Sequence, residues 1–375
     1  MLRYMTAGES HGKGIMAILD GVPAGLAMDE KFINNELARR MAGYGRGGRM
    51  DIEKDKVDII AGCRRGLTIG SPIGLTVSNK DHSIDELDDV KCPRPGHADL
   101  AGIQKYGLKD ARDVLERASA RETVARTAVG AIAKLVLGQF GIKILSHVTM
   151  IGAVETKTEG LSFDQISKLA ESSSVRCADK EASECMCREI DKAKEAGDTL
   201  GGSFEVIAMS VPPGLGSYAQ WDRRLDGALA RSVMSIPAVK AVSIGSGIEC
   251  ACRKGSETHD EIIYNAVDKV FERLSNNAGG TEGGVTNGSP LIVKGFMKPI
   301  ATLGTPLKSV DVETKKESAA SKERADVCAV AACGVVAESA VALEIAAAFL
   351  EKFGGDSMTE VERNYKAYME NLKEL

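Results

Sequence analysis

Aromatic side chains, histidines and net positive charge are all scarce in this sequence of 375 residues. Aromatic residues make up 4% of the chain, with a single Trp, and 48 Lys and Arg face 53 Asp and Glu. Single-stranded nucleic acids stack on aromatic platforms, and duplexes or anionic membranes are attracted by a positive field. The composition therefore predicts no nucleic-acid partner and no membrane partner.

Long hydrophobic runs and metal-binding cysteine spacings are missing as well. The most apolar stretch, 327–350, is interrupted by Glu338 and Glu344, which predicts a buried, Ala-rich helix instead of a membrane span. The nine cysteines form no C-x-x-C pair, and the two C-x-C pairs have no accompanying pair of histidines. We therefore expect neither a disulfide framework nor a metal site. The N-terminus has no apolar leader core, so a cytoplasmic location is expected.

Glycine, in contrast, is abundant. It supplies 40 of 375 residues, about 11% against an average near 7%. Such an excess indicates either many tight turns or several places where the backbone approaches a ligand closely. The length alone, at roughly 150 residues per domain, favours two or three domains.

An internal sequence repeat, called the echo below, argues against a count of two or three domains. An apolar strand pattern that ends in Val-Pro-x-Gly-Leu occurs twice, and a Gly-Ser-Pro strand pattern follows each copy. The paired segments are 15–26 with 204–215, and 70–77 with 288–293. The echo favours one body, 1–375, made of two related halves at about 1–150 and 195–375 with a helical insert between them. The alternative is chance recurrence of common turn chemistry.

Capping signals and 3.6-residue periodicity predict several helix starts. Helices are expected to begin at Asp29 and near Ser119, Thr258 and Ser357. The polar segment 309–322 is typical of a mobile surface loop or a short helix.

Two of the five histidines have neighbours that suggest chemistry. His11, in Gly-Glu-Ser-His-Gly, and His97, in Arg-Pro-Gly-His, are flanked by glycine, which favours a turn with access to a ligand. Either could transfer a proton near neutral pH. His82, His147 and His259 fit a structural role better.

Arginines gather where glycine is frequent. They are Arg39, Arg40, Arg46, Arg49, Arg64, Arg65, Arg94, Arg117, Arg121 and Arg126. Guanidinium groups bind phosphate and carboxylate bidentately, so this pattern predicts an anion site. The alternative for any one arginine is a surface ion pair with Asp51, Glu53 or Asp55.

Two nucleotide-binding patterns are excluded. A Walker motif needs four residues between its two glycines and Ser or Thr after its Lys. Here only three residues separate Gly8 from Gly12, and Gly14 follows Lys13. The glycine run 43–48 lacks the preceding strand of a dinucleotide fingerprint. A phosphoryl transferase is therefore disfavoured.

The motifs resemble the chorismate synthase family. The segments that carry the resemblance, in order along the chain, are 8–12, 43–49, 94–99, 119–123, 212–216 and 324–328. It implies an α+β fold, a β-α-β sandwich with antiparallel sheets at the core, helices outside and an internal pseudo-symmetric duplication, assembled as a homotetramer. It implies a lyase that eliminates phosphate from 5-enolpyruvylshikimate 3-phosphate to give chorismate. Such enzymes need reduced FMN without net redox change, and NADPH serves some of them as reductant.

The resemblance also assigns roles to residues of this chain. His11 would protonate the leaving phosphate, His97 would protonate the reduced flavin, and Asp326 would assist removal of the C6 proton. The substrate contacts it implies are Ser10, Arg40, Arg46, Arg49, Arg94 and Arg121. The cofactor contacts it implies are Arg40, Arg46, Arg117, Ala118, Ser119, Pro237, Ala238, Gly283, Lys298, Pro299, Ile300, Ala301, Thr302 and Arg324.

Some alternatives stay open. Asp326 could instead cap the helix that follows it. A flavin-binding reductase or electron carrier would share the flavin site without lyase activity. The chain departs from the family pattern at Glu116, where other members have glycine, and at Ala332, where some carry arginine. The segment 309–322, just before Arg324, is a candidate lid.

Overall fold

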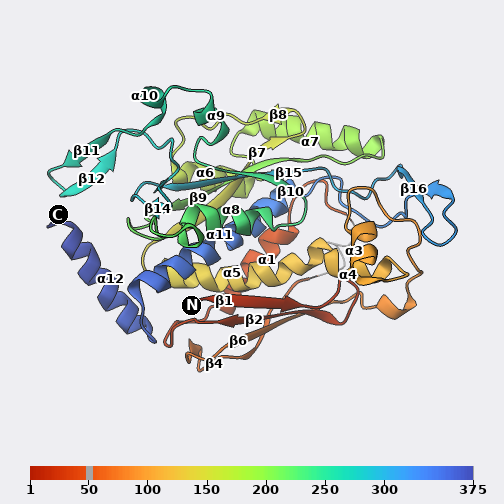
Figure 1. Ribbon diagram of the computed structural model, residues 1–375, viewed down its shortest axis with the longest axis horizontal. Helices are drawn as coiled ribbons and strands as arrows, with labels where there is room; N and C mark the ends of the chain where they lie inside the picture. Colours follow the sequence, from red (N-terminus) through yellow and green to blue (C-terminus); the bar gives the residue numbers. More distant parts are fainter. Residues whose placement is uncertain (48–53, 375) are drawn as a thin grey trace.

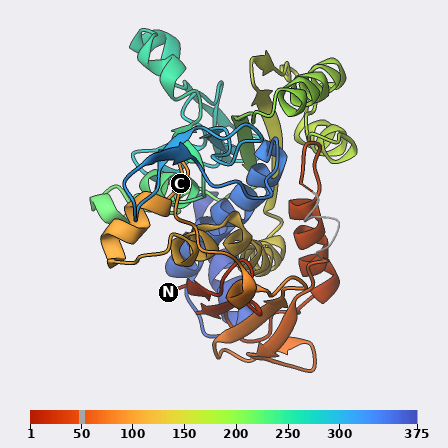
Figure 2. The same cartoon turned by 90° about the vertical axis from the view of Figure 1, so that its right-hand side faces the viewer.

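Two antiparallel sheets enclose a layer of helices (Figures 1 and 2). The computed structural model describes residues 1–47 and 54–374. The first sheet has the strand order β1 (Arg3–Ala7), β2 (Gly14–Asp20), β6 (Ile73–Ser78) and β3 (Asp58–Ala61). The second has the order β10 (Val239–Ile244), β15 (Leu291–Met297), β9 (Gly202–Met209), β7 (Lys143–Ile151) and β8 (Val154–Glu155).

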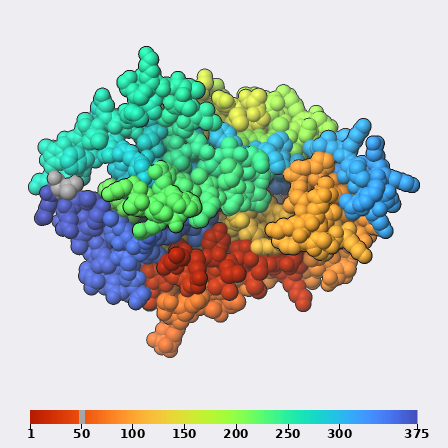
Figure 3. Space-filling view, in the orientation of Figure 1, coloured from red at the N-terminus to blue at the C-terminus, as the bar shows by residue number. Residues whose placement is uncertain are grey.

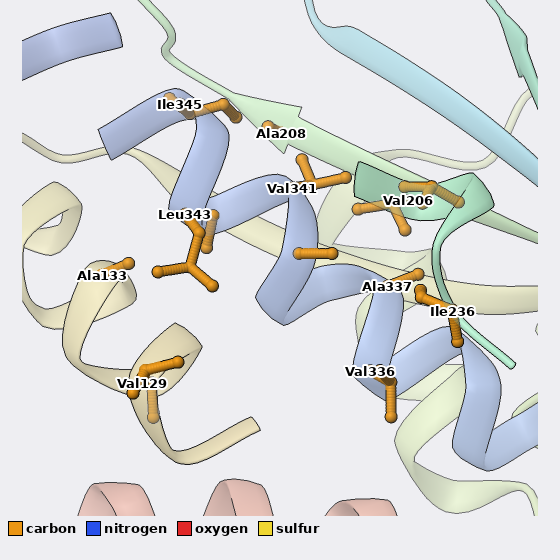
Figure 4. Close-up of a cluster of buried hydrophobic side chains, with 14 of the residues drawn as sticks. Val129, Ala133, Val206, Ala208, Ile236, Val336, Ala337, Val341, Leu343 and Ile345 are labelled. Carbon is orange, nitrogen blue, oxygen red and sulfur yellow. The ribbon is translucent and has the colours of Figure 1, made fainter. Parts of the chain in front are cut away.

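The central layer contains α5 (Thr123–Gly138) and α11 (Val330–Phe353), together with α1 (Glu30–Met41) and α8 (Leu225–Met234). One side of α11 packs on α5, while β7 and β9 lie against its other side, and α5 in turn packs on β2 and β6. Figure 4 shows Val129 and Ala133 of α5 and Val206 and Ala208 of β9 on opposite sides of α11.

This arrangement corrects the expected layer order of sheets at the core and helices outside. Helix α11 is apolar on all sides and rich in Ala and Val, and such a helix is stable only when it is surrounded by protein. Helices with one apolar stripe lie outside this layer: α6 (Phe163–Ser172) and α7 (Lys180–Glu195) cover part of the second sheet. The α+β class itself is confirmed.

The predicted helix at 327–350 is confirmed as α11. By length and composition this helix could cross a membrane, but 78% of its most apolar window is buried inside the protein. Burial of that kind is typical of the core helix of a globular protein.

The predicted helix starts had mixed outcomes. Asp29 caps α1, and Ser357 opens α12 (Met358–Leu372) with the expected capping box. Near Ser119 the chain first makes a 3₁₀ turn, η2 (Ala120–Glu122), and α5 starts at Thr123. The prediction at Thr258 is wrong.

A hairpin of β11 (Ile262–Asn265) and β12 (Val270–Arg273) follows Thr258 in place of a helix. The Asp260 carboxylate accepts the N–H groups of Asn277 and Ala278, and the carbonyl of Glu261 accepts the N–H of Leu274 beside the hairpin. The hairpin projects from the body at one end (Figure 1).

The segment 309–322 is also a hairpin, not a helix. It carries β16 (Lys308–Val310) and β17 (Glu317–Ala319) and lies beside α3 (Asp99–Tyr106) and α4 (Arg112–Ala118) at the opposite end (Figure 3). The remaining elements are β4 (Cys63–Arg64), β5 (Leu67–Thr68), η1 (Ile84–Glu86), η3 (Trp221–Arg223), α9 (Ile248–Ala251), α10 (Gly255–Thr258), β13 (Thr281–Glu282) and β14 (Val285–Thr286). All nine cysteines are free thiols.

Candidate active site

A cavity of about 500 Å³ brings most of the predicted site residues together. A volume in this range is typical of pockets for small molecules and cofactors. The predicted residues in its wall are Ser10, His11, Arg40, Arg46, Arg94, His97, Ala118, Ser119, Arg121, Pro237, Ala238, Lys298, Ile300, Ala301, Thr302, Arg324 and Asp326.

Four predicted residues are not placed in the wall. Arg117 faces the first sheet, where it donates to the backbone oxygens of Thr6 and Gly8. Pro299 does not line the cavity, and neither does Gly283, which lies in the turn between β13 and β14. Arg49 lies outside the described residues.

His11 is held on the loop between β1 and β2. The Asn79 side-chain amide donates to the carbonyls of Glu9, Ser10 and Gly12, at 2.8 to 3.1 Å. Gly8 adopts a φ of +108°, and a Cβ there would lie 2.2 Å from a backbone oxygen, so only glycine fits the start of this loop. His11 is 9% exposed and lies in the cavity wall, with its Nδ1 turned toward Glu116.

His97 is held by a fully buried carboxylate. Its Nδ1 lies 2.5 Å from Oδ1 of Asp99, and Arg94 donates to both oxygens of the same group at 2.8 and 3.0 Å. Burial alone would raise the pKa of Asp99, but the hydrogen bonds from His97 and Arg94 hold it well below its usual range. Arg94 also donates to Thr302 at 2.7 Å and so links the two halves of the wall.

Three further arginines line the cavity: Arg40 of α1, Arg46 in the loop after α1, and Arg121 of η2. Arg40 and Arg121 share the buried carboxylate of Asp55, at 3.4 and 2.6 Å. Burial lowers the pKa of Arg40 to about 10; Asp55 opposes the shift, and the positive charges of Arg46 and Arg121 add to it. An anion bound here would compensate this positive charge.

Asp326 pairs with Arg46 at 3.2 Å, and its other oxygen accepts the N–H of Gly47 at 2.6 Å. It does not cap α11, which begins at Val330 after Ala329. The open alternative that Asp326 is a helix cap is therefore wrong, and its carboxylate faces the cavity.

The opposite wall comes from the second sheet and its flanking loops. Ala238 adopts a φ of +70°, a strained conformation for an alanine, and its carbonyl accepts the N–H of Lys298 at 2.9 Å. Burial lowers the pKa of Lys298, and nearby Lys240 adds to the effect. Strained backbone of this kind occurs at ligand sites.

Several residues that build the site carry no signal in the sequence. Asp55, Asn79 and Asp81 belong to no motif. Asn79 and Asp81 follow β6 of the first sheet, and Asp55 lies between α1 and β3; their side chains contact Arg40, the loop that carries His11, and His11 itself. Glu116 and Ala332, the two departures from the family pattern, both matter locally: Glu116 contacts His11, and Ala332 lines the cavity.

The site can bind an anion with several charges beside two groups able to transfer protons. Among residues 1–47 and 54–374, no group of three or more His, Cys, Asp or Glu is arranged to hold a metal ion. The fold and the site thus fit a class of enzyme in which an arginine-rich cavity is suited to a polyanionic ligand and to acid–base chemistry.

Comparison with known proteins identifies the family. Residues 2–350 match the family model described as chorismate synthase. The chain is 52% identical to a chorismate synthase of Desulforudis audaxviator, covering 100% of this chain and 98% of that one. It is 50% identical to that of Geobacter sulfurreducens over both full lengths. A crystal structure of a chorismate synthase aligns with a TM-score of 0.83 at 44% identity, covering 100% of this chain and 99% of that one.

The chain belongs to the chorismate synthase family. It is therefore a lyase of the shikimate pathway, which leads to aromatic amino acids, and its activity is that of a chorismate synthase.

Proposed function

We propose that this chain eliminates phosphate from 5-enolpyruvylshikimate 3-phosphate in a 1,4-anti elimination, with reduced FMN bound in the same cavity. The observation that supports this best is one cavity that joins Arg40, Arg46, Arg94 and Arg121 to His11 and His97. A substrate with one phosphate and two carboxylates needs such a concentration of guanidinium groups in a protein with net charge −5.

The substrate is held by the arginines and by Ser10. Arg40, Arg94 and Arg121 are each less than 10% exposed, so their guanidinium groups are fixed by Asp55 and Asp99 before a ligand arrives. Arg49 belongs to the proposed set, although it lies outside the described residues.

The wall fits a flavin. Small and apolar groups that a flat ring can pack against, Ala118, Ile236, Pro237, Ala238, Ile300 and Ala301, lie beside the cations Lys298 and Arg324. When bound, reduced FMN supplies electron density that assists cleavage of the C3–O bond. The residues of the chain bind and orient the two ligands, exclude water and hold the protons.

Proton transfer falls to three residues. His11 would give its proton to the leaving phosphate, His97 would supply a proton to bound reduced FMN, and Asp326 would assist removal of the C6 proton. All three line the cavity, and each side chain has a partner that fixes it. Glu116 contacts His11, Asp99 contacts His97, and Arg46 pairs with Asp326.

Anaerobic incubation with reduced FMN and 5-enolpyruvylshikimate 3-phosphate tests the proposal. Phosphate release and chorismate absorbance in equal amounts are expected. Binding of reduced FMN without phosphate release would favour the alternative of a flavin carrier. Repeating the assay with oxidised FMN and NADPH distinguishes a chain that reduces its own flavin from one that needs a separate reductase.

Two related halves are the second part of the proposal. The order β1-β2-β6-β3 in the first sheet corresponds to β7-β9-β15-β10 in the second. In each half a threonine Oγ1 donates to the proline carbonyl and accepts the leucine N–H of the Val-Pro-x-Gly-Leu turn. The two sets are Thr68 with Pro23 and Leu26, at 2.7 and 2.9 Å, and Thr286 with Pro212 and Leu215, at 2.6 and 2.8 Å. Superposition of the halves should pair the strands in this order; any other pairing contradicts the duplication.

A cytoplasmic homotetramer completes the proposal. The outer face of the first sheet exposes apolar side chains at Met5, Met16, Ile18 and Ile60, a patch that contact with another copy would cover. Ile18→Glu should convert the tetramer into a smaller species by light scattering. An unchanged mass would remove this face from the interface.

A further inference from the structure

Glu116 contacts both the ring and the backbone of His11. It lies in the last turn of α4, 105 positions along the chain from His11, and is 1% exposed. Its Oε2 accepts the backbone N–H of His11 at 2.7 Å, and its two oxygens lie 3.0 and 3.1 Å from Nδ1. Its own carbonyl accepts the N–H of Ser10 at 3.0 Å. One buried residue therefore fixes this histidine at two points.

This contact sets which ring nitrogen carries hydrogen. Burial alone would raise the pKa of Glu116, but the hydrogen bonds from the His11 side chain and backbone keep that pKa below its usual value, so the carboxylate is ionised at neutral pH. An ionised carboxylate only accepts hydrogen bonds, so Nδ1 of His11 must donate. Nε2 is then the nitrogen that exchanges its proton with a ligand.

The charged groups around the ring come from three segments. Asp81, in the loop after β6, places Oδ2 3.9 Å from Nε2, and Arg324 binds that oxygen at 3.0 Å. Arg112, on α4, lies 3.6 Å from Glu116. Two carboxylates thus flank the imidazole, and each has an arginine partner.

We propose that Glu116 is a positioning residue for the lyase reaction, holding His11 with Nδ1 protonated so that Nε2 carries the proton delivered to the leaving phosphate. The inference rests on the function proposed for His11. In this step the Nε2–H bond breaks and an O–H bond forms on phosphate. The C3–O bond breaks with its electron pair going to that oxygen. The electron pair of the C6–H bond replaces it through a shift of the ring double bond, as the C6 proton leaves to the base, and His11 ends as the neutral Nδ1–H tautomer. Glu116 stays ionised throughout.

His97 offers an internal comparison. Its Nδ1 also faces a buried carboxylate, that of Asp99, but Arg94 binds both oxygens of that group. At Glu116 the nearest arginine nitrogen is 3.6 Å away, and the shorter contacts go to His11. Removing the charge of Glu116 should therefore act mainly through His11.

Glu116→Gln keeps the shape of the side chain and removes its charge. We expect kcat to fall about 10- to 100-fold with KM changed less than about threefold, and the alkaline limb of the kcat profile to move about one unit to lower pH, because the protonated imidazole loses its nearest anion. Glu116→Asp, which restores a carboxylate, should recover part of both effects. The matched control is Glu205→Gln, which removes a carboxylate 3.3 Å from His147 outside the cavity wall and should leave the profile unchanged. A Glu116→Gln profile that superimposes on the wild type would overturn the inference.

A second measurement is independent of turnover and of the variant's folding. Long-range ¹H–¹⁵N correlation spectra of the wild-type protein without flavin should show the neutral His11 ring as the Nδ1–H tautomer. A neutral ring protonated on Nε2 would refute the role of Glu116, even if the enzyme makes chorismate. Conversely, the Nδ1–H tautomer without phosphate release would leave the contact in place and refute the proposed function.

Discussion

Oδ2 of Asp326 lies 3.2 Å from the guanidinium of Arg46, while Oδ1 of the same carboxylate accepts the N–H of Gly47 at 2.6 Å. Asp326, which is proposed to help remove a proton, thus forms an ion pair with Arg46, which is proposed to bind the substrate. The two roles can be separated, because an amide keeps the contact with Gly47 and loses the charge.

Asp326→Asn should therefore lower kcat about 100-fold or more, since a general base contributes on that scale, while KM rises far less because Arg46 remains. Steady-state kinetics with reduced FMN measure both constants. If kcat stays within twofold and KM rises tenfold, Asp326 serves only to orient Arg46.

Replacing either histidine by alanine should lower kcat about 100-fold or more with the fold intact. His11 and His97 both line the cavity, so loss of either removes a proton donor from the proposed elimination. Circular dichroism checks the fold, and His259→Ala, in an exposed segment, is the control. Near-normal turnover in both variants would remove these histidines from the mechanism.

The order of the layers can be tested at one glycine. A Cβ on Gly130 of α5 would lie 2.2 Å from Cβ of Ser339 on α11, so the two helices touch because a side chain is absent there. Gly130→Ala should destabilise the protein by about 1–3 kcal/mol through overpacking. Gly138→Ala, in the same helix with open space around it, should be neutral or slightly stabilising. Equal melting temperatures for the two variants would contradict the close contact.

The motifs predicted which residues lie together in one cavity better than they predicted the order of the layers. Residues from 8–12, 94–99 and 324–328 line the same cavity, although only the first two segments contain the glycines or proline that favour turns. Whether sheets or helices form the middle layer depends on pairings between distant segments, such as α5 with α11, which local pattern does not encode. The contact between His11 and Glu116 spans 105 positions and has no periodic signal.

Buried carboxylates with lowered pKa values should make the free energy of unfolding depend on pH. Burial alone would raise the pKa of Glu338, but Lys134 and Arg39 hold it far below its usual range; the pKa values of Asp99 and Glu116 are lowered too. At a pH between the lowered pKa of such a group in the folded protein and its ordinary pKa in the unfolded chain, the unfolded chain binds more protons than the folded protein. The stabilisation is therefore complete above about pH 4.5 and is lost as pH falls below it, by about 1.4 kcal/mol per unit for each group.

Glu338→Gln isolates one of these groups. The variant leaves Arg39, Lys134 and Arg176 facing a neutral amide, so about 3–5 kcal/mol of stability should be lost at pH 7. The loss should shrink as pH falls from 4.5 toward 2.5. Urea unfolding at several pH values measures both effects, and a pH-independent difference would show that the charge of Glu338 is not responsible.

The hairpin of β16 and β17 is positioned to respond to ligands. The N–H of Val312 donates to the carbonyl of Lys91 at 2.9 Å, and Ser309 Oγ donates to that of Pro93 at 2.6 Å, immediately before Arg94 of the cavity. If 309–322 is a lid, flavin and substrate together should slow trypsin cleavage after Lys315 at least several-fold, because closure orders the segment. Cleavage after Lys254, remote from the cavity wall, is the control and should not change. Equal cleavage rates at Lys315 with and without both ligands would show that the hairpin does not close over the site.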